Sequence, residues 1–145
     1  MAPRLASSPS FRTLLGILLL AVAPGHAAAS NRFTQCPRGG GTNCVVDGDT
    51  FWMDGVKIRI ADIDTPETHP PRCPDEARLG NAATDRLQAL LNSGPFDLQQ
   101  TRRDTDRYGR KLRIVARHGR SIGDTLIAEG LARPYAGGPR AGWCA

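Results

Sequence analysis

The chain has 145 residues, of which 40% are hydrophobic and 23% charged, and its formal net charge is +5 at pH 7. This length fits one small domain, and no internal repeat or long low-complexity region is present. The mild positive charge would help a polyanion approach but is too small to indicate a nucleic acid-binding protein by itself. The apolar run at residues 14–23 is too short to span a bilayer.

The first thirty residues have the pattern of an export signal. Arg4 and Arg12 precede the apolar run, and a tract of small residues follows it at positions 27–30. A basic start, a short apolar segment and an A-x-A-like site are typical of a secretory signal peptide. We therefore expect a signal at residues 1–29 and one exported domain at residues 30–145, periplasmic or secreted and free of the membrane once processed. An uncleaved membrane anchor is the alternative.

All four cysteines lie after this segment, at Cys36, Cys44, Cys73 and Cys144. An even number in a small exported domain favours two disulfides, for which three connectivities are possible. We prefer Cys36–Cys44, which closes a short glycine-rich loop, and Cys73–Cys144, which ties the end of the chain to the loop after Glu67. A zinc site built from the four thiolates is the competing interpretation, but no CxxC spacing occurs.

Strand signals come first along the domain. The pattern predicts strands at residues 44–46, 50–53 and 56–60, with Asp54-Gly55 as a hairpin turn between the last two. In the third strand the two-residue period puts Val56, Ile58 and Ile60 on one face and Arg59 on the other. We expect that other face to form the floor of a surface cleft.

A constrained loop with four prolines follows at residues 65–74, and then a helix begins near Asp75 and stops at Asn92-Ser93-Gly94-Pro95. The remaining pattern predicts strands at residues 96–101 and 111–116 and a second helix at residues 122–129 that Ser121 caps. Five strands with two to three helices indicate an α+β fold, a small five-stranded β-barrel of OB type. A plain antiparallel sheet with flanking helices is the alternative.

The residues between Val45 and Glu67 carry the chemistry. Asp49, Arg59 and Asp64 interrupt an otherwise apolar β pattern. Burying a carboxylate beside a hydrophobic run costs free energy unless a cation, such as a metal ion, neutralises its charge. This stretch is therefore a candidate active site with a metal.

Four motifs connect this stretch to a known family. VVDGDT, IRIADIDTPE, DRYGRKL and IAEGLAR follow one another in an order and spacing that resemble the staphylococcal (micrococcal) nuclease, or thermonuclease, family. The resemblance covers residues 44–135. It implies an OB-type barrel and calcium-dependent hydrolysis of DNA and RNA that leaves 3′-phosphates on the products.

The resemblance also implies a role for each matching acid. Asp49 and Asp64 would be carboxylate ligands of Ca²⁺, and Thr65 would contribute its backbone carbonyl. Glu67 would lie beside the water shell of the metal and serve as a candidate general base. Hard oxygen ligands of this kind suit calcium and leave places for water and a phosphate oxygen. Without the upstream acids, Thr65-Pro66-Glu67 would be interpreted as a helix-entry cap.

The basic and aromatic residues of the motifs would hold the substrate. Arg59 and Arg110 would bind the scissile phosphate, since one guanidinium group can donate two parallel hydrogen bonds to phosphate oxygens. Tyr108 would approach a terminal phosphate, and Tyr135 falls where the family places an aromatic residue that stacks on a base. The charged segment at residues 104–110 would otherwise be a solvated hairpin tip.

Two other functions stay open from the sequence. One is a non-catalytic OB-fold module that binds nucleic acid, and the other is an envelope protein with a structural calcium ion. The loop after Glu67 is also shorter than in the secreted archetype of the family and carries Pro70, Pro71 and Cys73, which puts substrate steering by this loop in doubt. We expect a monomer.

Overall fold

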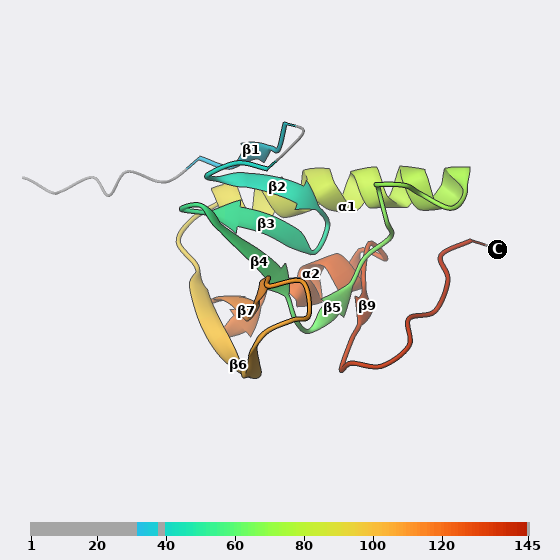
Figure 1. Ribbon diagram of the computed structural model, residues 1–145. Coiled ribbons are helices and arrows are strands. Elements are labelled where there is room, and N and C mark those ends of the chain that lie inside the picture. Colours follow the sequence, from blue (N-terminus) through green and yellow to red (C-terminus); the bar gives the residue numbers. More distant parts are fainter. Residues whose placement is uncertain (1–31, 38–39, 145) are drawn as a thin grey trace, which may run out of the picture.

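The computed structural model describes residues 32–37 and 40–144, and the predicted signal at residues 1–29 lies outside this range. One sheet has the strand order β1-β2-β3-β4-β7-β6, with β8 paired to β7, and a two-stranded sheet joins β5 to β9 (Figure 1). The strands are β1 (Thr34–Gln35), β2 (Cys44–Asp47), β3 (Thr50–Met53), β4 (Val56–Ile60), β5 (Ile63–Asp64), β6 (Asp97–Thr105), β7 (Lys111–Arg117), β8 (Arg120–Ser121) and β9 (Arg133–Pro134). The helices in the described part are α1 (Pro74–Asn92) and α2 (Gly123–Ala128).

All five predicted strands are present, as β2, β3, β4, β6 and β7, and the mixed sheet with two helices is consistent with the OB-type α+β fold. The sheet is not plainly antiparallel, because β4 pairs with β7 in parallel and β1 pairs with β2 in parallel. Four further strands of two residues each, β1, β5, β8 and β9, were not predicted. Such pieces are too short to show an alternating pattern.

The predicted hairpin turn between β3 and β4 is confirmed. Asp54 and Gly55 both have positive φ angles, 50° and 78°. Two consecutive residues with positive φ are the requirement of a type I′ turn, whose twist matches that of the flanking strands. The turn fixes the register in which Thr50 lies opposite Arg59, and this pair is central to the site.

A single hydrophobic core lies between the sheet and the helices. Phe33, Phe51 and Phe96 pack edge to face or tilted, with ring centroids 5.8 to 6.4 Å apart. The side chains buried around them come from β2 to β5, α1, β7, α2 and their connections: Val45, Ile58, Ile60, Ile63, Leu87, Leu90, Leu91, Val115, Ile122, Leu126 and Ala132. The burial of these groups supplies the main stabilisation of the fold.

Helix α1 packs closely against the turn between β2 and β3. A Cβ atom on Gly48 would lie 2.5 Å from the Cβ of Ala83 in α1 and 2.9 Å from Cγ2 of Thr65. A Cβ atom on Gly80 would similarly lie 2.9 Å from the carbonyl oxygen of Pro66. Glycine at these two positions therefore lets the turn, the segment after β5 and α1 come together.

The start of α2 differs in detail from the prediction. Ser121 lies in β8 and is not the N-cap residue, which is Ile122. The Ser121 hydroxyl nevertheless accepts from the amide of Gly123, the first residue of α2, at 3.0 Å, and it donates to Asp62 Oδ2 at 2.6 Å. On β4, Ile58 and Ile60 are buried, whereas Val56 at the start of the strand is 45% exposed.

Both preferred disulfides are present, Cys36–Cys44 and Cys73–Cys144. The first joins β2 to the segment just after β1, and the second joins the start of α1 to the C-terminal tail. Cys73 is also the N-cap residue of α1, where its sulfur accepts from the amide of Glu76. None of the helices in the described range is long and apolar enough to cross a membrane.

Candidate active site

The acids of the first two motifs converge on one guanidinium group. Arg59 lies in β4 and is only 2% exposed. Its Nη2 atom is 3.0 Å from Asp49 Oδ2 and 3.9 Å from Asp64 Oδ1. Both carboxylates are 5% exposed, so this ion cluster is buried. As expected, Arg59 points away from the apolar face and lines a surface cleft, although neighbouring segments leave only 2% of the residue exposed.

Backbone contacts fix the orientation of the cluster. Arg59 Nη1 donates to the carbonyl oxygens of Ile60 and Ile63, the latter at 2.9 Å, which holds the guanidinium in the bend between β4 and β5. The Thr65 amide donates to Asp49 Oδ2 at 3.2 Å. Asp49, from the turn after β2, and Thr65, just after β5, are therefore in direct contact although 16 positions separate them.

The turn that carries Asp49 is shaped by Asp47. Asp47 Oδ1 accepts from the amide of Asp49 at 3.2 Å, the local bond expected of a turn aspartate. Burial, with the neighbouring charge of Asp49, raises the pKa of Asp47 to about 7. Burial also raises the pKa of Asp64, against the opposing effect of nearby arginines. Burial thus disfavours the ionised forms of these two carboxyl groups, and a bound cation would stabilise them.

A second guanidinium is linked to the same cluster from the β6–β7 hairpin. Arg110 Nε is 2.6 Å from Asp106 Oδ2, and its Nη1 donates to the Thr50 hydroxyl at 3.5 Å. Thr50, which is buried in β3, donates in turn to Asp49 Oδ1 at 3.0 Å. A short chain of polar contacts therefore joins Arg110 to the carboxylate that also pairs with Arg59.

The aromatic residues of the motifs stand at the edge of this arrangement. Tyr108 is 68% exposed, and its ring centroid is 5.4 Å from the guanidinium carbon of Arg110. The Tyr135 ring, just after β9, lies 5.8 Å from the guanidinium carbon of Arg59. The amide of Tyr135 donates to the carbonyl oxygen of Asp62 at 2.8 Å, which fixes it beside β5.

These groups line one cleft with a volume of about 990 Å³. Its walls include the predicted catalytic and substrate-binding residues and a further arginine from the tail: Arg59, Glu67, Tyr108, Arg110, Tyr135 and Arg140. Asp49 and Asp64 are not among the lining residues; they lie behind the wall, in contact with Arg59. Arg102, Arg103 and Arg107 extend the basic lining along β6 and the hairpin.

The donors fit a hard divalent cation, although no group of three or more His, Cys, Asp or Glu side chains comes together among the described residues. Two buried carboxylates converge, and the Asp64 Oδ1 atom is contacted by the guanidinium groups of Arg140, at 3.1 Å, and Arg59, at 3.9 Å, so this oxygen already faces positive charge. Carboxylate oxygens, a backbone carbonyl and water form a set that calcium accepts. Asp49, Asp64 and Thr65 are the residues that could hold it.

Sequence reasoning missed three contributors. Thr50 is part of the DGDT motif, where it was treated only as a strand residue. Arg140 Nε lies 3.1 Å from Asp64 Oδ1, and Trp143 Nε1 lies 3.3 Å from Asp64 Oδ2. The tail in which they lie shows no periodic pattern, and the predicted Cys73–Cys144 bond was the signal that could have placed it near the site.

Residues 57–141 match the family described as staphylococcal nuclease homologue. The chain belongs to the staphylococcal nuclease family. Among curated proteins, it is 40% identical over 93 residues to the endonuclease YncB of Bacillus subtilis, covering 61% of this chain and 44% of that protein. It is 34% identical, also over 93 residues, to the thermonuclease of Staphylococcus hyicus, covering 61% of this chain and 54% of that one. The match thus spans about half the length of these relatives.

Proposed function

We propose that this family member is an exported, calcium-dependent nuclease that hydrolyses phosphodiester bonds of DNA, RNA or both and leaves 3′-phosphates. The observation that carries the proposal is the convergence of Asp49 and Asp64 on Arg59 behind a cleft whose wall also holds Arg110. The names of the relatives, endonuclease and thermonuclease, agree with this activity. The proposed domain, residues 30–145, acts as a monomer in the periplasm or outside the cell.

The two arginines have the chemistry to bind the scissile phosphate. Arg59 lines the cleft, and its Nη2 atom is paired with Asp49 Oδ2 at 3.0 Å, so its guanidinium is fixed in position before a phosphate binds. Arg110 lines the same cleft and is held by Asp106 and Thr50. Guanidinium donors fixed in advance stabilise charge that builds up on phosphate oxygens and lose little order in doing so.

Glu67 would receive a proton from the attacking water, and its position in the wall of the cleft supports this role. When bound at Asp49, Asp64 and the Thr65 carbonyl, calcium would supply positive charge to the phosphate and orient water. The water oxygen would bond to phosphorus opposite the 5′-oxygen as the P–O5′ bond breaks, the departing 5′-oxygen would take a proton from solvent, and the phosphate would stay on the 3′ side. Tyr108 and Tyr135 would contact a terminal phosphate and a base, respectively.

The test is cleavage of single-stranded DNA by the purified domain, with calcium and with a chelator. We expect cleavage only with calcium and a decrease of at least roughly a hundredfold in Arg110→Ala and in Arg59→Lys, which keeps the charge but loses the guanidinium fork. Phosphatase-sensitive 3′ ends identify the products. Arg120→Gln, on β8 outside the cleft, removes one charge and is expected to cleave as the wild type does.

Binding of DNA without cleavage in calcium would contradict the proposal. It would favour instead a nucleic acid-binding module built on the same barrel. Cleavage that persists in chelator would reject the role of the cation. The Arg59 and Arg110 variants would then still test whether these arginines bind the phosphate.

A further inference from the structure

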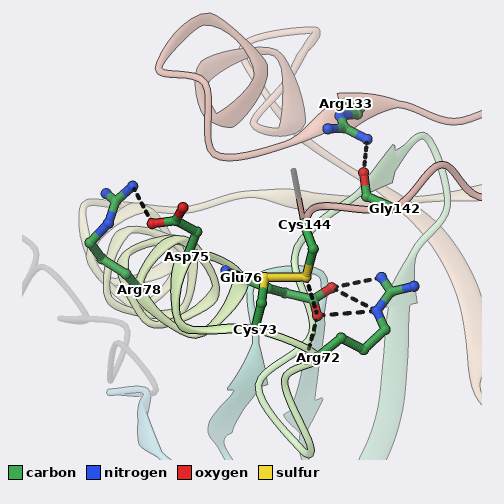
Figure 2. The surroundings of a disulfide bond; sticks show 8 residues. All are labelled: Arg72, Cys73, Asp75, Glu76, Arg78, Arg133, Gly142 and Cys144. Atoms are coloured by element: carbon green, nitrogen blue, oxygen red, sulfur yellow. Dashed lines mark hydrogen bonds and ion pairs between the residues drawn. A yellow bond between two sulfur atoms is a disulfide. The ribbon is translucent and has the colours of Figure 1, made fainter.

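The C-terminal tail returns across the site. Beyond β9 it runs back toward the first turn of α1 (Figure 1), where Cys144 is bonded to Cys73 (Figure 2). We call residues 136–144 the strap. Because the disulfide lies next to the end of the described chain, both ends of the strap are anchored, one in β9 and the other at α1.

Contacts along the strap fix its path. Arg133 of β9 donates from Nη1 to the carbonyl oxygen of Gly142 at 2.9 Å (Figure 2). The same guanidinium lies 3.7 Å from the ring centroid of Trp143, close enough for a cation–π interaction. The Tyr135 hydroxyl donates to the carbonyl oxygen of Gly138 at 3.0 Å. An arginine and a tyrosine at the start of the tail therefore hold its middle and its end.

This path puts the side chains of the strap on the carboxylates of the site. Arg140 Nε is 3.1 Å from Asp64 Oδ1, and its Nη1 is 3.5 Å from Glu67 Oε1. Its guanidinium carbon is 5.3 Å from the Tyr135 ring centroid. Trp143 Nε1 donates to the other oxygen, Asp64 Oδ2, at 3.3 Å. The strap thus contacts both oxygens of Asp64.

We propose that Arg140 sets the cation affinity of the site, because the strap places its guanidinium on Asp64, one of the two carboxylates that would hold a divalent cation, and on Glu67 beside it. The inference rests on the proposed function, since it takes Asp64 as a cation ligand. A cation with two positive charges and the guanidinium repel each other at one carboxylate, so binding of the cation displaces Arg140. The disulfide keeps the displaced arginine close, at a high effective concentration, and the competition persists.

The direct test is isothermal titration calorimetry of calcium into the oxidised domain without nucleic acid. We expect Arg140→Gln to bind calcium roughly two- to fivefold more tightly than the wild type, the upper part of the range for a partly exposed ion pair that no longer has to be broken. The matched control is Arg78→Gln, which removes the same charge from an exposed side chain of α1 and is expected to leave affinity unchanged.

A second pair of variants separates the position of Arg140 from its charge. The double variant Cys73→Ser, Cys144→Ser removes the disulfide and so releases the end of the strap, but it keeps Arg140. Serine at position 73 can still cap α1. We expect this double variant to bind calcium more tightly as well, and the effect of Arg140→Gln to shrink in its background. Circular dichroism checks that each variant is folded.

Fluorescence reports the displacement itself. The chain has two tryptophans, so Trp52→Phe leaves Trp143 as the single tryptophan, whose emission is selected by excitation beyond the absorption of tyrosine. Calcium is expected to change its emission when the bond to Asp64 is given up, and the change is expected to be lost in Asp64→Asn.

The outcomes distinguish this inference from the proposed function. If the wild type binds calcium through Asp64 and Arg140→Gln binds it equally or more weakly, the inference is wrong and the nuclease proposal stands. If neither protein binds calcium, both fail, because Asp64 is then no cation ligand. Unchanged Trp143 emission on binding would likewise overturn the displacement of the strap.

Discussion

Arg59 and Arg110 are assigned to the same phosphate, but the structure holds them in different ways. Arg59 is buried between two carboxylates and two backbone carbonyls, in the bend between β4 and β5. Arg110 stands on a hairpin with a fifth of its side chain exposed, and its ion pair is with Asp106 of the same hairpin. The buried arginine is therefore part of the fold as well as of the site, whereas the hairpin arginine belongs mainly to the site.

The largest expected effect comes from removing the buried member. Arg59→Ala leaves Asp49 and Asp64 buried without their common cation, and we expect the free energy of unfolding to fall by about 3–5 kcal/mol. Arg110→Ala removes a partly exposed pair within one hairpin, and we expect a loss of about 1 kcal/mol or less. Urea denaturation without calcium measures both. Similar losses in the two variants would erase the distinction between the two arginines.

The sequence predicted most of the frame in which these residues lie. Alternation and the Asp54-Gly55 turn located β3 and β4, and helical spacing located α1, because these elements are long enough to show a period. The same alternation put the side chains of Arg59 and Ile58 on opposite faces of β4, but it could not show that the Arg59 side chain is buried as well. Its cover comes from short segments, β5 and Tyr135 just after β9, whose positions depend on tertiary contacts. The cluster around Arg59 could be named from its motifs, whereas Arg140 could not.

A smaller effect is expected in acid, at the end of α1 that anchors the strap. The hydrogen bonds from Arg72 lower the pKa of Glu76 to about 2, from an ordinary value of 4.5, although burial opposes this (Figure 2). Because the folded-state pKa is the lower one, this contribution to stability is present above pH 4.5 and is lost as the pH falls toward 2.

Thermal unfolding of the wild type and of Glu76→Gln, measured from neutral pH down to pH 2, tests the contribution of the Arg72–Glu76 ion pair. The variant lacks the ionised partner at every pH, so its melting temperature should lie below that of the wild type at neutral pH. The gap should narrow as the pH falls from 4.5 to 2. A gap that stays constant through this window would show that Glu76 acts through packing and not through its charge.

The smallest effects, on the affinity for single-stranded DNA, are expected from the outer rim of the cleft. The basic side chains there lie on β6 and the following hairpin and are exposed to solvent: Arg102, Arg103 and Arg107. Charges in this position attract the phosphate backbone without reading its sequence. Replacing any one by Gln should weaken binding of single-stranded DNA alike for all sequences and reduce the slope of log affinity against log salt by about 0.7. Fluorescence anisotropy in chelator measures binding without cleavage, and Arg120→Gln serves as the control. If a variant has the same salt slope as the control, the arginine that it lacks does not contact nucleic acid and is a solubilising surface charge. That result for all three would confine substrate contact to the part of the cleft between Arg59 and Arg110.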